Sequence, residues 1–354
     1  MTGPTDTTRT MNPPRPRAAI IGLGLILIVG LLALASPMVA PNGPGTQFPD
    51  RAFAPPMRIQ VRDATGLRAP FVYRQVLENR LERRFRDDRA AAVPLRWLAQ
   101  GRVVTIPGDE PLLLLGGDAL GRDVFSRLLF GARLSLGVTL LGSVGALLAG
   151  ALIGAVAGTL GGRVDMVLML AADFLLVLPG VYFVLVLRAM LPQALSTTDV
   201  FWLMAALFAL AGWPHVARGV RAIVSAERRL DYAEAARAAG AGSLRLVAHL
   251  LPAARGFLVV ELVLLVPALL VAEATISFLG LGFPEPAPSW GTMLQEAGNV
   301  SGLVSAPWTL APAAALFIVV LGVQLAGGAR SADNLLMNLD RGTRPRETRL
   351  RGPA

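Results

Sequence analysis

The chain has 354 residues, of which 54% are hydrophobic and 16% are charged, and its mean hydropathy is +0.57. In soluble domains about a quarter of the residues are charged. Here the apolar residues gather in long uncharged blocks of the kind that crosses a bilayer. Cysteine is absent, which excludes disulfides, thiolate metal sites and a cysteine nucleophile. All 33 basic residues are arginine, which excludes a Walker A loop because that loop needs a lysine. The composition indicates a multi-pass membrane protein.

The net charge of +9 and the isoelectric point near 11.3 are high enough to suggest a nucleic-acid partner. The arginines, however, lie beside the apolar blocks, so membrane topology is the simpler explanation and no nucleic-acid partner is expected. There are only two histidines, too few for a histidine-rich metal centre. We therefore predict that this chain itself binds no metal or cofactor.

Six apolar blocks predict six transmembrane helices and an all-α membrane fold. They lie at 18–35, 134–162, 166–187, 200–217, 256–283 and within 306–326. The first block could be a signal peptide cleaved after residue 40. Its apolar run is longer than the usual signal-peptide core, so we expect a retained first helix over 18–40.

Arginine placement orients these helices, because cytoplasmic segments are enriched in positive charge. The N-terminal segment holds three arginines, the 218–255 loop seven and the C-terminal segment six, whereas the loop between the fifth and sixth blocks has none. Both termini and the 218–255 loop are therefore predicted to be cytoplasmic, and the long 41–133 region, with 15 arginines, extracytoplasmic. The expected domains are a cytoplasmic tail (1–17), the first helix (18–40), an extracytoplasmic insertion (41–133), a five-helix core (134–329) and a cytoplasmic tail (330–354).

The insertion is expected to be a small α/β-like unit. Apolar residues at 72, 76, 77, 81 and 85, with an acidic and a basic residue four apart at 82 and 86, predict a helix. The stretches 103–106 and 112–115, separated by a Pro-Gly-Asp turn, predict a hairpin. A solvated cap and a docking surface for an external partner are both open interpretations.

A stripe of small residues recurs every fourth position in the second block, at Gly142, Ala146, Gly150, Gly154 and Gly158. Positions four apart share one face of a helix, and small residues let a neighbouring helix approach closely. We expect this face to pack against another helix rather than to line a pathway.

The predicted cytoplasmic loop holds Asp-Tyr-Ala-Glu-Ala-Ala-Arg-Ala-Ala-Gly at 231–240 and Leu251-Pro252 further on. The alanines favour a helix that Gly240 can end in a left-handed conformation, and 243–250 can form a second helix. A short helix–turn–helix that projects from a bundle is a rigid knob, suited to passing motion to a partner.

This loop resembles the EAA loop of binding-protein-dependent ABC importer permeases. In that family the loop inserts into a groove on the ATPase subunit and couples its closure to opening of the pathway. The residues that we expect to serve this coupling are Asp231, Tyr232, Glu234, Ala235, Ala236, Gly240, Leu251 and Pro252.

Two further stretches narrow the resemblance. Leu-Gly-Arg-Asp-Val-Phe-Ser-Arg at 120–127, followed by Gly-Ala-Arg-Leu-Ser-Leu at 131–136, is similar to the segment that leads into the second helix of dipeptide/oligopeptide permeases of the C-component type. Ile-Ser-Phe-Leu-Gly-Leu-Gly at 276–282, with Pro-Ser-Trp-Gly at 288–291, is similar to the stretch after that family's fifth helix.

The resemblance implies a type I ABC importer permease in a bacterial inner membrane, importing di- or oligopeptides or related solutes by alternating access. It further implies a heterodimer with a second related permease, two ATPase subunits that hold ATP and Mg, and an extracytoplasmic solute-binding protein. The chain itself would then be no enzyme.

Three polar residues in the apolar blocks are candidate functional positions, since an unpaired charge in a bilayer is costly. Asp173 suggests a pathway or salt-bridge role, and Glu273 and Ser277, four apart on one helix face, suggest a role at a subunit seam or outer gate. The alternatives are an ion-driven transporter that uses Asp173 and Glu273, and an intramembrane hydrolase, for which only one deep aspartate is available.

Overall fold

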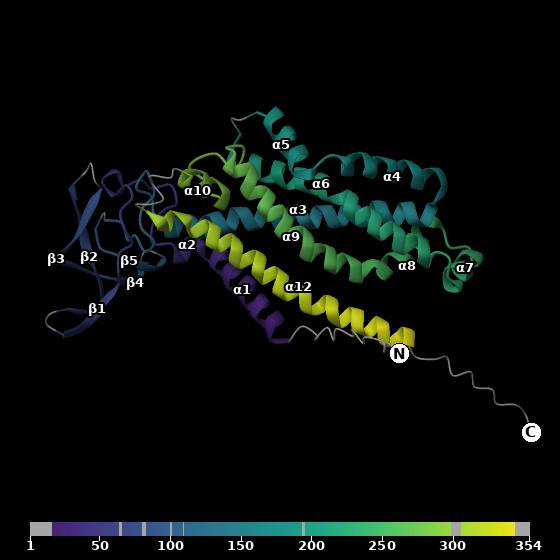
Figure 1. Ribbon diagram of the computed structural model, residues 1–354, viewed down its shortest axis with the longest axis horizontal. Helices are drawn as coiled ribbons and strands as arrows, with labels where there is room; N and C mark the ends of the chain where they lie inside the picture. The colour runs from purple at the N-terminus through teal and green to yellow at the C-terminus, as the bar shows by residue number, and fades with distance from the viewer. Residues whose placement is uncertain are drawn as a thin grey trace, which may run out of the picture.

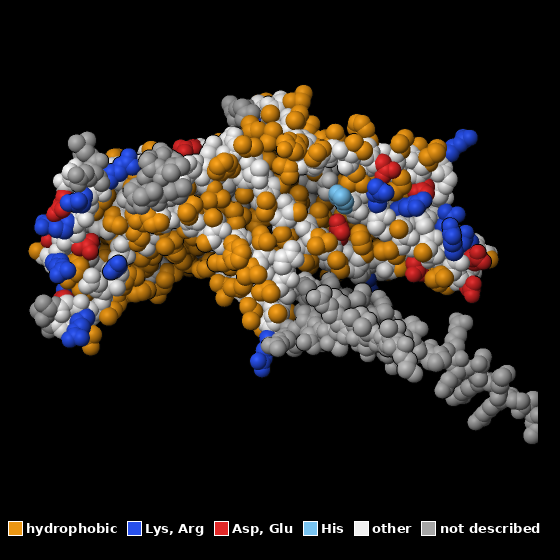
Figure 2. All heavy atoms as spheres, viewed as in Figure 1, with side chains coloured by type: hydrophobic (Ala, Val, Ile, Leu, Met, Phe, Trp, Pro, Cys, Tyr) orange, Lys and Arg blue, Asp and Glu red, His pale blue; other side chains and the backbone are white. Residues whose placement is uncertain are grey.

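A long helical bundle carries a small β module at one end and two short helices at the other (Figure 1). This computed structural model describes residues 16–63, 66–79, 83–99, 101–108, 110–192, 195–298 and 306–343, and within 328–343 only the helical backbone. Residues 1–15 of the expected tail 1–17, and residues 344–354 of the expected tail 330–354, lie outside the described residues. Hydrophobic side chains cover the flank of the bundle, whereas charged side chains gather at its two ends (Figure 2).

Each of the six predicted blocks coincides with helical structure in the bundle, although the third is divided between two helices. The helices of the bundle are α1 (Pro16–Leu34), α2 (Ser36–Val39), α3 (Val124–Leu160), α4 (Gly162–Val177), α5 (Gly180–Met190), α6 (Thr197–Glu227), α9 (Arg255–Phe278), α10 (Trp290–Ala297) and α12 (Ala311–Thr343). In the described part of the chain five helical segments are long and apolar enough to cross a membrane, and α4 with α5 makes a sixth when counted as one span.

The third span is not the single helix that we predicted over 166–187. It is broken between Val177 and Gly180, where α4 and α5 meet at an angle of 85°. Pro179 lacks an N–H and disfavours the helical conformation of the residue before it. Leu178 is accordingly extended, with φ −81° and ψ 127°.

The small-residue stripe of α3 packs against α6, as the sequence predicted. A Cβ atom at Gly142 would lie 2.6 Å from the Cβ of Phe208, and one at Gly150 would overlap the Cβ of Val216. The two helices thus approach each other closely only because these positions lack a side chain. This contact forms the centre of the bundle.

The first helix is integrated into the bundle through α12, which lies beside it (Figure 1). A Cβ atom at Gly22 of α1 would lie 2.5 Å from the carbonyl oxygen of Gly322. Two backbones therefore meet here at a glycine pair, a contact of the small-residue type that membrane helices use.

The β module consists of two antiparallel sheets. One has the strand order β1 (Gln60–Asp63), β2 (Gly66–Asn79), β3 (Arg84–Pro94), and the other pairs β4 (Arg96–Ala99) with β5 (Arg102–Thr105). The core of the module is formed by buried residues from the strands and the flanking segments: Ala54, Met57, Val72, Leu95, Val104, Leu112 and Leu113.

The helix predicted from the apolar residues between 72 and 85 is wrong. Val72, Val76 and Leu77 belong to β2 and Phe85 to β3, and exposed and more buried side chains alternate from Arg74 to Asn79 with the period of a strand. The charge spacing that suggested a helical pair between residues 82 and 86 is used differently, because Arg86 pairs across the strands with Glu78 at 3.0 Å. Leu81 and Glu82 lie outside the described residues.

The predicted hairpin of 103–106 with 112–115 is also wrong. Val103 to Thr105 do form a strand, β5, but it pairs with the preceding β4, and Gly101 turns between them with φ +74°. Leu112 and Leu113 are buried in the module without forming a strand. Their apolar run reflects core packing, which residue spacing alone cannot distinguish from a buried strand.

Candidate functional site

The two short helices α7 (Asp231–Ala238) and α8 (Ser243–Leu250) form a knob at the end of the bundle opposite the β module (Figure 1). Their inner faces are buried by Ala233, Leu246 and Leu250, which join the hydrophobic cluster of α6. Packing against a long helix gives these eight-residue helices the stability that they would lack alone. The knob is therefore a fixed extension of the bundle.

The turn between α7 and α8 depends on Gly240, as predicted. Gly240 has φ +82°, the N–H of Ala241 donates to the carbonyl oxygen of Ala236 at 3.0 Å, and the N–H of Gly240 donates to that of Arg237 at 2.9 Å. This pair of bonds is a Schellman motif, which a residue with a left-handed backbone completes. The motif sets the direction in which α8 leaves α7.

The outer face of α7 is open to solvent. The exposed residues are Asp231, Tyr232, Glu234 and Ala235. The two carboxylates lie in the first turn of α7, where they stabilise the helix by interacting with the positive end of its dipole. The hydroxyl of Tyr232 donates to Glu227 at 2.6 Å, and this bond raises the pKa of Tyr232. The face thus presents two carboxylates and one aromatic ring to a partner.

The remaining residues of the loop lie where the knob rejoins the membrane. Ala236 is half-buried in the cluster under α7. Leu251 and the exposed Pro252 begin a short turn of 3₁₀ helix, Leu251–Ala254, that leads into α9. The structure therefore brings all eight of the predicted loop residues into one continuous unit.

A second candidate site lies at the other end of α9, near the β module. Glu273 and Ser277 are fully buried, and the Ser277 hydroxyl donates to Oε1 of Glu273 at 2.7 Å. The hydroxyl groups of Ser135 on α3 and Ser289 before α10 surround the same carboxyl group, and Oε2 has no hydrogen-bond partner among the described residues. The cluster joins three elements that are distant in sequence.

The glycines of the neighbouring motifs make this cluster possible. Gly280 has φ +80° and ends α9 in a second Schellman motif, with the Leu281 N–H donating to the Ile276 carbonyl oxygen at 3.1 Å. A Cβ atom at Gly291 would lie 2.5 Å from the Cβ of Ser277, and one at Gly282 would overlap the Ser277 side chain. The chain can return to Ser277 only with glycine at these positions.

A buried charge cluster that we did not predict lies at the N-terminal end of α3. Arg122 contacts Asp118 at 2.7 Å and Glu296 at 2.8 Å, and Arg127 contacts Glu296 at 2.7 Å. Burial alone would lower the pKa of Arg122, but Asp118, Glu296 and Glu285 outweigh it and raise that pKa. Burial raises the pKa of Glu296, while Arg127 and Arg122 oppose this effect.

Asp123 completes this buried charge cluster, which we call the outer joint. Its carboxylate accepts hydrogen bonds from the N–H groups of Phe125 and Ser126, and so caps the N-terminus of α3. The side-chain amide of Asn42 donates to the same carboxylate at 3.0 Å, while burial raises the pKa of Asp123. The Gly-Arg-Asp motif therefore ties the segment after the first helix to α3 and α10. The motif itself was visible in the sequence. Its ion-pair partners were not, because they lie up to 174 positions away, as Glu296 does from Arg122.

Asp173 on α4 forms an ion pair with Arg218 on α6 at 3.1 Å, and both side chains are about half-exposed. Asp173 and Glu273 therefore have separate sets of partners. Within the described ranges there is no group of three or more histidine and carboxylate side chains that could hold a metal ion.

The fold is that of a multi-pass membrane protein, and its family makes it a permease subunit. The family described as binding-protein-dependent transport system inner membrane component matches residues 150–329, and the N-terminal TM domain of oligopeptide transport permease C matches residues 15–56. The chain belongs to the binding-protein-dependent ABC permeases of the dipeptide/oligopeptide type, and it has their type I permease fold. This confirms the resemblance drawn from the motifs.

Similar proteins cover most of the chain. The dipeptide transport system permease protein DppC of Escherichia coli (strain K12) is 35% identical over 321 residues, which are 90% of this chain and 89% of that protein. The di/tripeptide transport system permease protein DppC of Pseudomonas aeruginosa (strain UCBPP-PA14) is 32% identical over 89% of this chain and 87% of its own length. The oligopeptide transport system permease protein OppC of Bacillus subtilis (strain 168) is 37% identical over 61% of this chain and 70% of its own length.

Proposed function

We propose that the chain is the permease subunit of an ATP-driven importer for di- or oligopeptides or related solutes. Relatives named as dipeptide, di/tripeptide and oligopeptide permeases support this substrate class. Substrate would pass by alternating access from an external solute-binding protein to the cytoplasm, through a pathway shared with a second, related permease. Two separate ATPase subunits would hold ATP and Mg.

The observation that carries the coupling proposal is the α7–α8 knob. Glu234 and Ala235 face solvent on a helix whose other side is anchored by Ala233. A force applied to the exposed face of α7 would therefore move α6 and α9 rather than bend a loose loop. We assign ATPase contact to the exposed face of α7 and transmission to the buried face.

The topology follows from the two ends of the molecule. With the knob in the cytoplasm, the β module at the opposite end is extracytoplasmic, and the N-terminal end of α1 and the C-terminal part of α12 are cytoplasmic. The arginine distribution supports the same orientation. The proposed domain boundaries are those expected from the sequence, with 218–255 as the coupling loop inside the core and a β module in place of the expected α/β-like insertion. The packing of α1 against α12 supports a first helix that is retained.

Glu273 and Ser277 act in this proposal at the outer gate. They tie α9 to α3 and to the segment before α10 on the side of the β module. A fully buried carboxyl group that accepts from one serine hydroxyl and lies beside two more can shift partners when the helices move apart, whereas an apolar contact has no such directional preference. Asp173, paired with Arg218, instead holds α4 to α6.

The test is peptide uptake by proteoliposomes that contain the assembled transporter and its binding protein. We expect uptake that needs ATP, that does not follow an imposed proton or sodium gradient, and that falls at least tenfold in Glu234→Ala. Arg62→Gln, an exposed position in the β module, is the matched control. Gradient-driven uptake without ATP would overturn the proposal in favour of the ion-driven alternative.

A further inference from the structure

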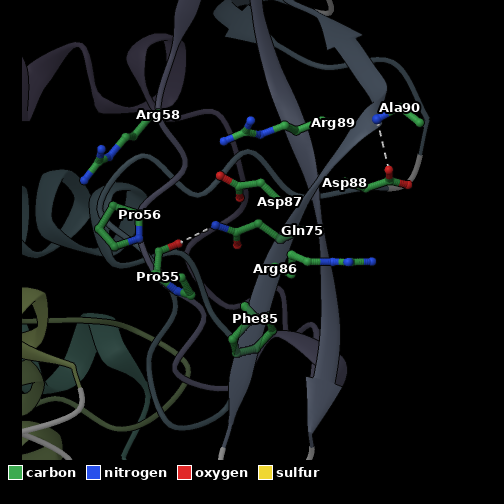
Figure 3. Close-up of a pocket in the computed structure, with 10 residues that line it drawn as sticks. All are labelled: Pro55, Pro56, Arg58, Gln75, Phe85, Arg86, Asp87, Asp88, Arg89 and Ala90. Atoms are coloured by element: carbon green, nitrogen blue, oxygen red, sulfur yellow. Dashed lines mark hydrogen bonds between the residues drawn. The ribbon is translucent and has the colours of Figure 1, made fainter.

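The β module contains a groove that the transport proposal does not use. One wall is a face of the β2–β3 ladder, and the other is the segment from Pro55 to Arg58, which runs ahead of β1 (Figure 3). The cavity between them has a volume of about 860 Å³, within the range of pockets that hold small molecules. Phe85 and the prolines supply apolar surface to it.

The floor of the groove holds a buried amide with a free acceptor. Gln75 is 3% exposed, and its Nε2 donates to the Pro55 carbonyl oxygen at 3.1 Å. Its Oε1 has no hydrogen-bond partner within the described ranges. A buried acceptor without a donor is costly, so a ligand N–H that reached Oε1 would recover that hydrogen bond.

Three charged side chains flank the floor. Asp87, the cross-strand partner of Gln75, and Arg89 project from β3 toward the opposite wall, which carries Arg58 (Figure 3). All three are exposed, and in the described part of the chain none of them forms an ion pair. Arg86, on the other side of β3, is by contrast paired with Glu78. Unlike Arg86, these three groups are therefore available to a ligand.

We propose that this groove binds a short zwitterionic peptide at the outer entrance of the transporter, an inference that rests on the proposed peptide import. The two arginines would hold the carboxylate, while Asp87 and Oε1 of Gln75 would accept from the ammonium group and an amide N–H. Asp87 would repel a simple anion, and the arginines would repel a metal cation. Asp87 and Arg89 both come from β3 and project into the groove (Figure 3), so one short peptide can present its ammonium group to the first and its carboxylate to the second.

The test is calorimetric titration of trialanine into the assembled transporter in nanodiscs, without its external binding protein. We expect saturable binding that weakens at least tenfold in the double variant Arg58→Gln/Arg89→Gln and stays within twofold in Arg62→Gln, which lies on β1 outside the groove. N-acetyl-trialanine amide, which lacks both end charges, should bind at least tenfold more weakly than trialanine. Gln75→Met, which keeps the bulk but removes the Oε1 acceptor together with the Nε2 donor to Pro55, should weaken trialanine binding as well.

Equal trialanine affinity in the wild type and the double variant would overturn the proposal, as would the absence of saturable binding to the wild type. The groove proposal would also be overturned if the double variant bound the external binding protein more weakly than the wild type does but bound trialanine with wild-type affinity. If wild-type proteoliposomes show ATP-dependent peptide uptake while the titration is flat, only the groove proposal fails. If they show no such uptake, the proposed function fails, whatever the titration gives.

Discussion

Gly240 offers a perturbation of the coupling loop whose cost follows from backbone geometry alone. Its φ of +82° is left-handed, and a Cβ atom there would meet nothing within 4 Å. Gly240→Ala therefore creates no clash, but it must pay the cost of a left-handed L-residue, about 1–2 kcal/mol. If the free knob relaxes this strain and must regain its native arrangement to bind the ATPase, the cost weakens ATPase binding about 5- to 30-fold. Gly240→Asn should lose less, because asparagine tolerates the left-handed region better.

Gly242 provides the matched control two residues away. It has φ −67° and ψ 160° and also has open space around its Cα, so alanine fits there without backbone strain. The assay is the affinity of the purified ATPase subunit for the permease pair in nanodiscs. We expect the order of affinity wild type, Gly242→Ala, Gly240→Asn, Gly240→Ala. Wild-type affinity in Gly240→Ala, or an equal loss in Gly242→Ala, would refute the argument from the turn.

Three further predictions concern the bundle and its outer joint. The Cβ atom of Gly150→Ala would overlap Val216 and lie 2.7 Å from a backbone oxygen, so this variant should be less stable by about 1–3 kcal/mol. Gly24→Ala, in open space on α1, should instead be more stable by up to about 1 kcal/mol. Thermal unfolding in detergent measures both changes. Arg122→Met leaves Asp118 and Glu296 short of a buried partner and should cost about 3–5 kcal/mol in the same assay. Burial raises the pKa of Glu296, so the folded protein binds a proton at this carboxyl group more tightly than the unfolded chain does. This proton stabilises the fold fully at pH values below the unfolded pKa, and the stabilisation is lost as the pH rises through the folded pKa. The Tm of the wild type should therefore fall relative to that of Glu296→Gln as the pH rises above about 4.3, the usual glutamate pKa, and a constant difference would contradict this.

The spans and the helix–turn–helix form of the α7–α8 knob could be predicted from the sequence because each depends on local chemistry. A membrane helix needs a long apolar run, and the end of α7 needs a glycine at residue 240. The bend of the third span was also encoded locally, in Leu178-Pro179-Gly180. We missed it because hydropathy measures composition over a window and ignores the backbone requirements of proline.

The β module and the outer joint could not be predicted in the same way, because they depend on pairings between distant residues. The strands β2 and β3 are rich in arginine and exposed on much of their surface. They therefore lack a clear alternation of apolar and polar residues, and the few apolar residues that they contain have a spacing that also fits a helix. The contact of Arg122 with Glu296 joins residues 174 positions apart. The groove at Gln75 arises only once β2, β3 and the segment before β1 have come together.

The most direct test of the central claim, that the α7–α8 knob contacts the ATPase while the β module lies on the other side of the membrane, uses the absence of cysteine from the chain. A single cysteine is placed either at exposed Ala235 in α7 or at exposed Arg62 in the β module. A cleavable crosslinker is then applied to the assembled transporter in membranes. The account predicts that Ala235→Cys crosslinks to the ATPase subunit and Arg62→Cys does not. Crosslinking of the ATPase from Arg62→Cys, or its absence from Ala235→Cys in a complex that hydrolyses ATP, would contradict the account.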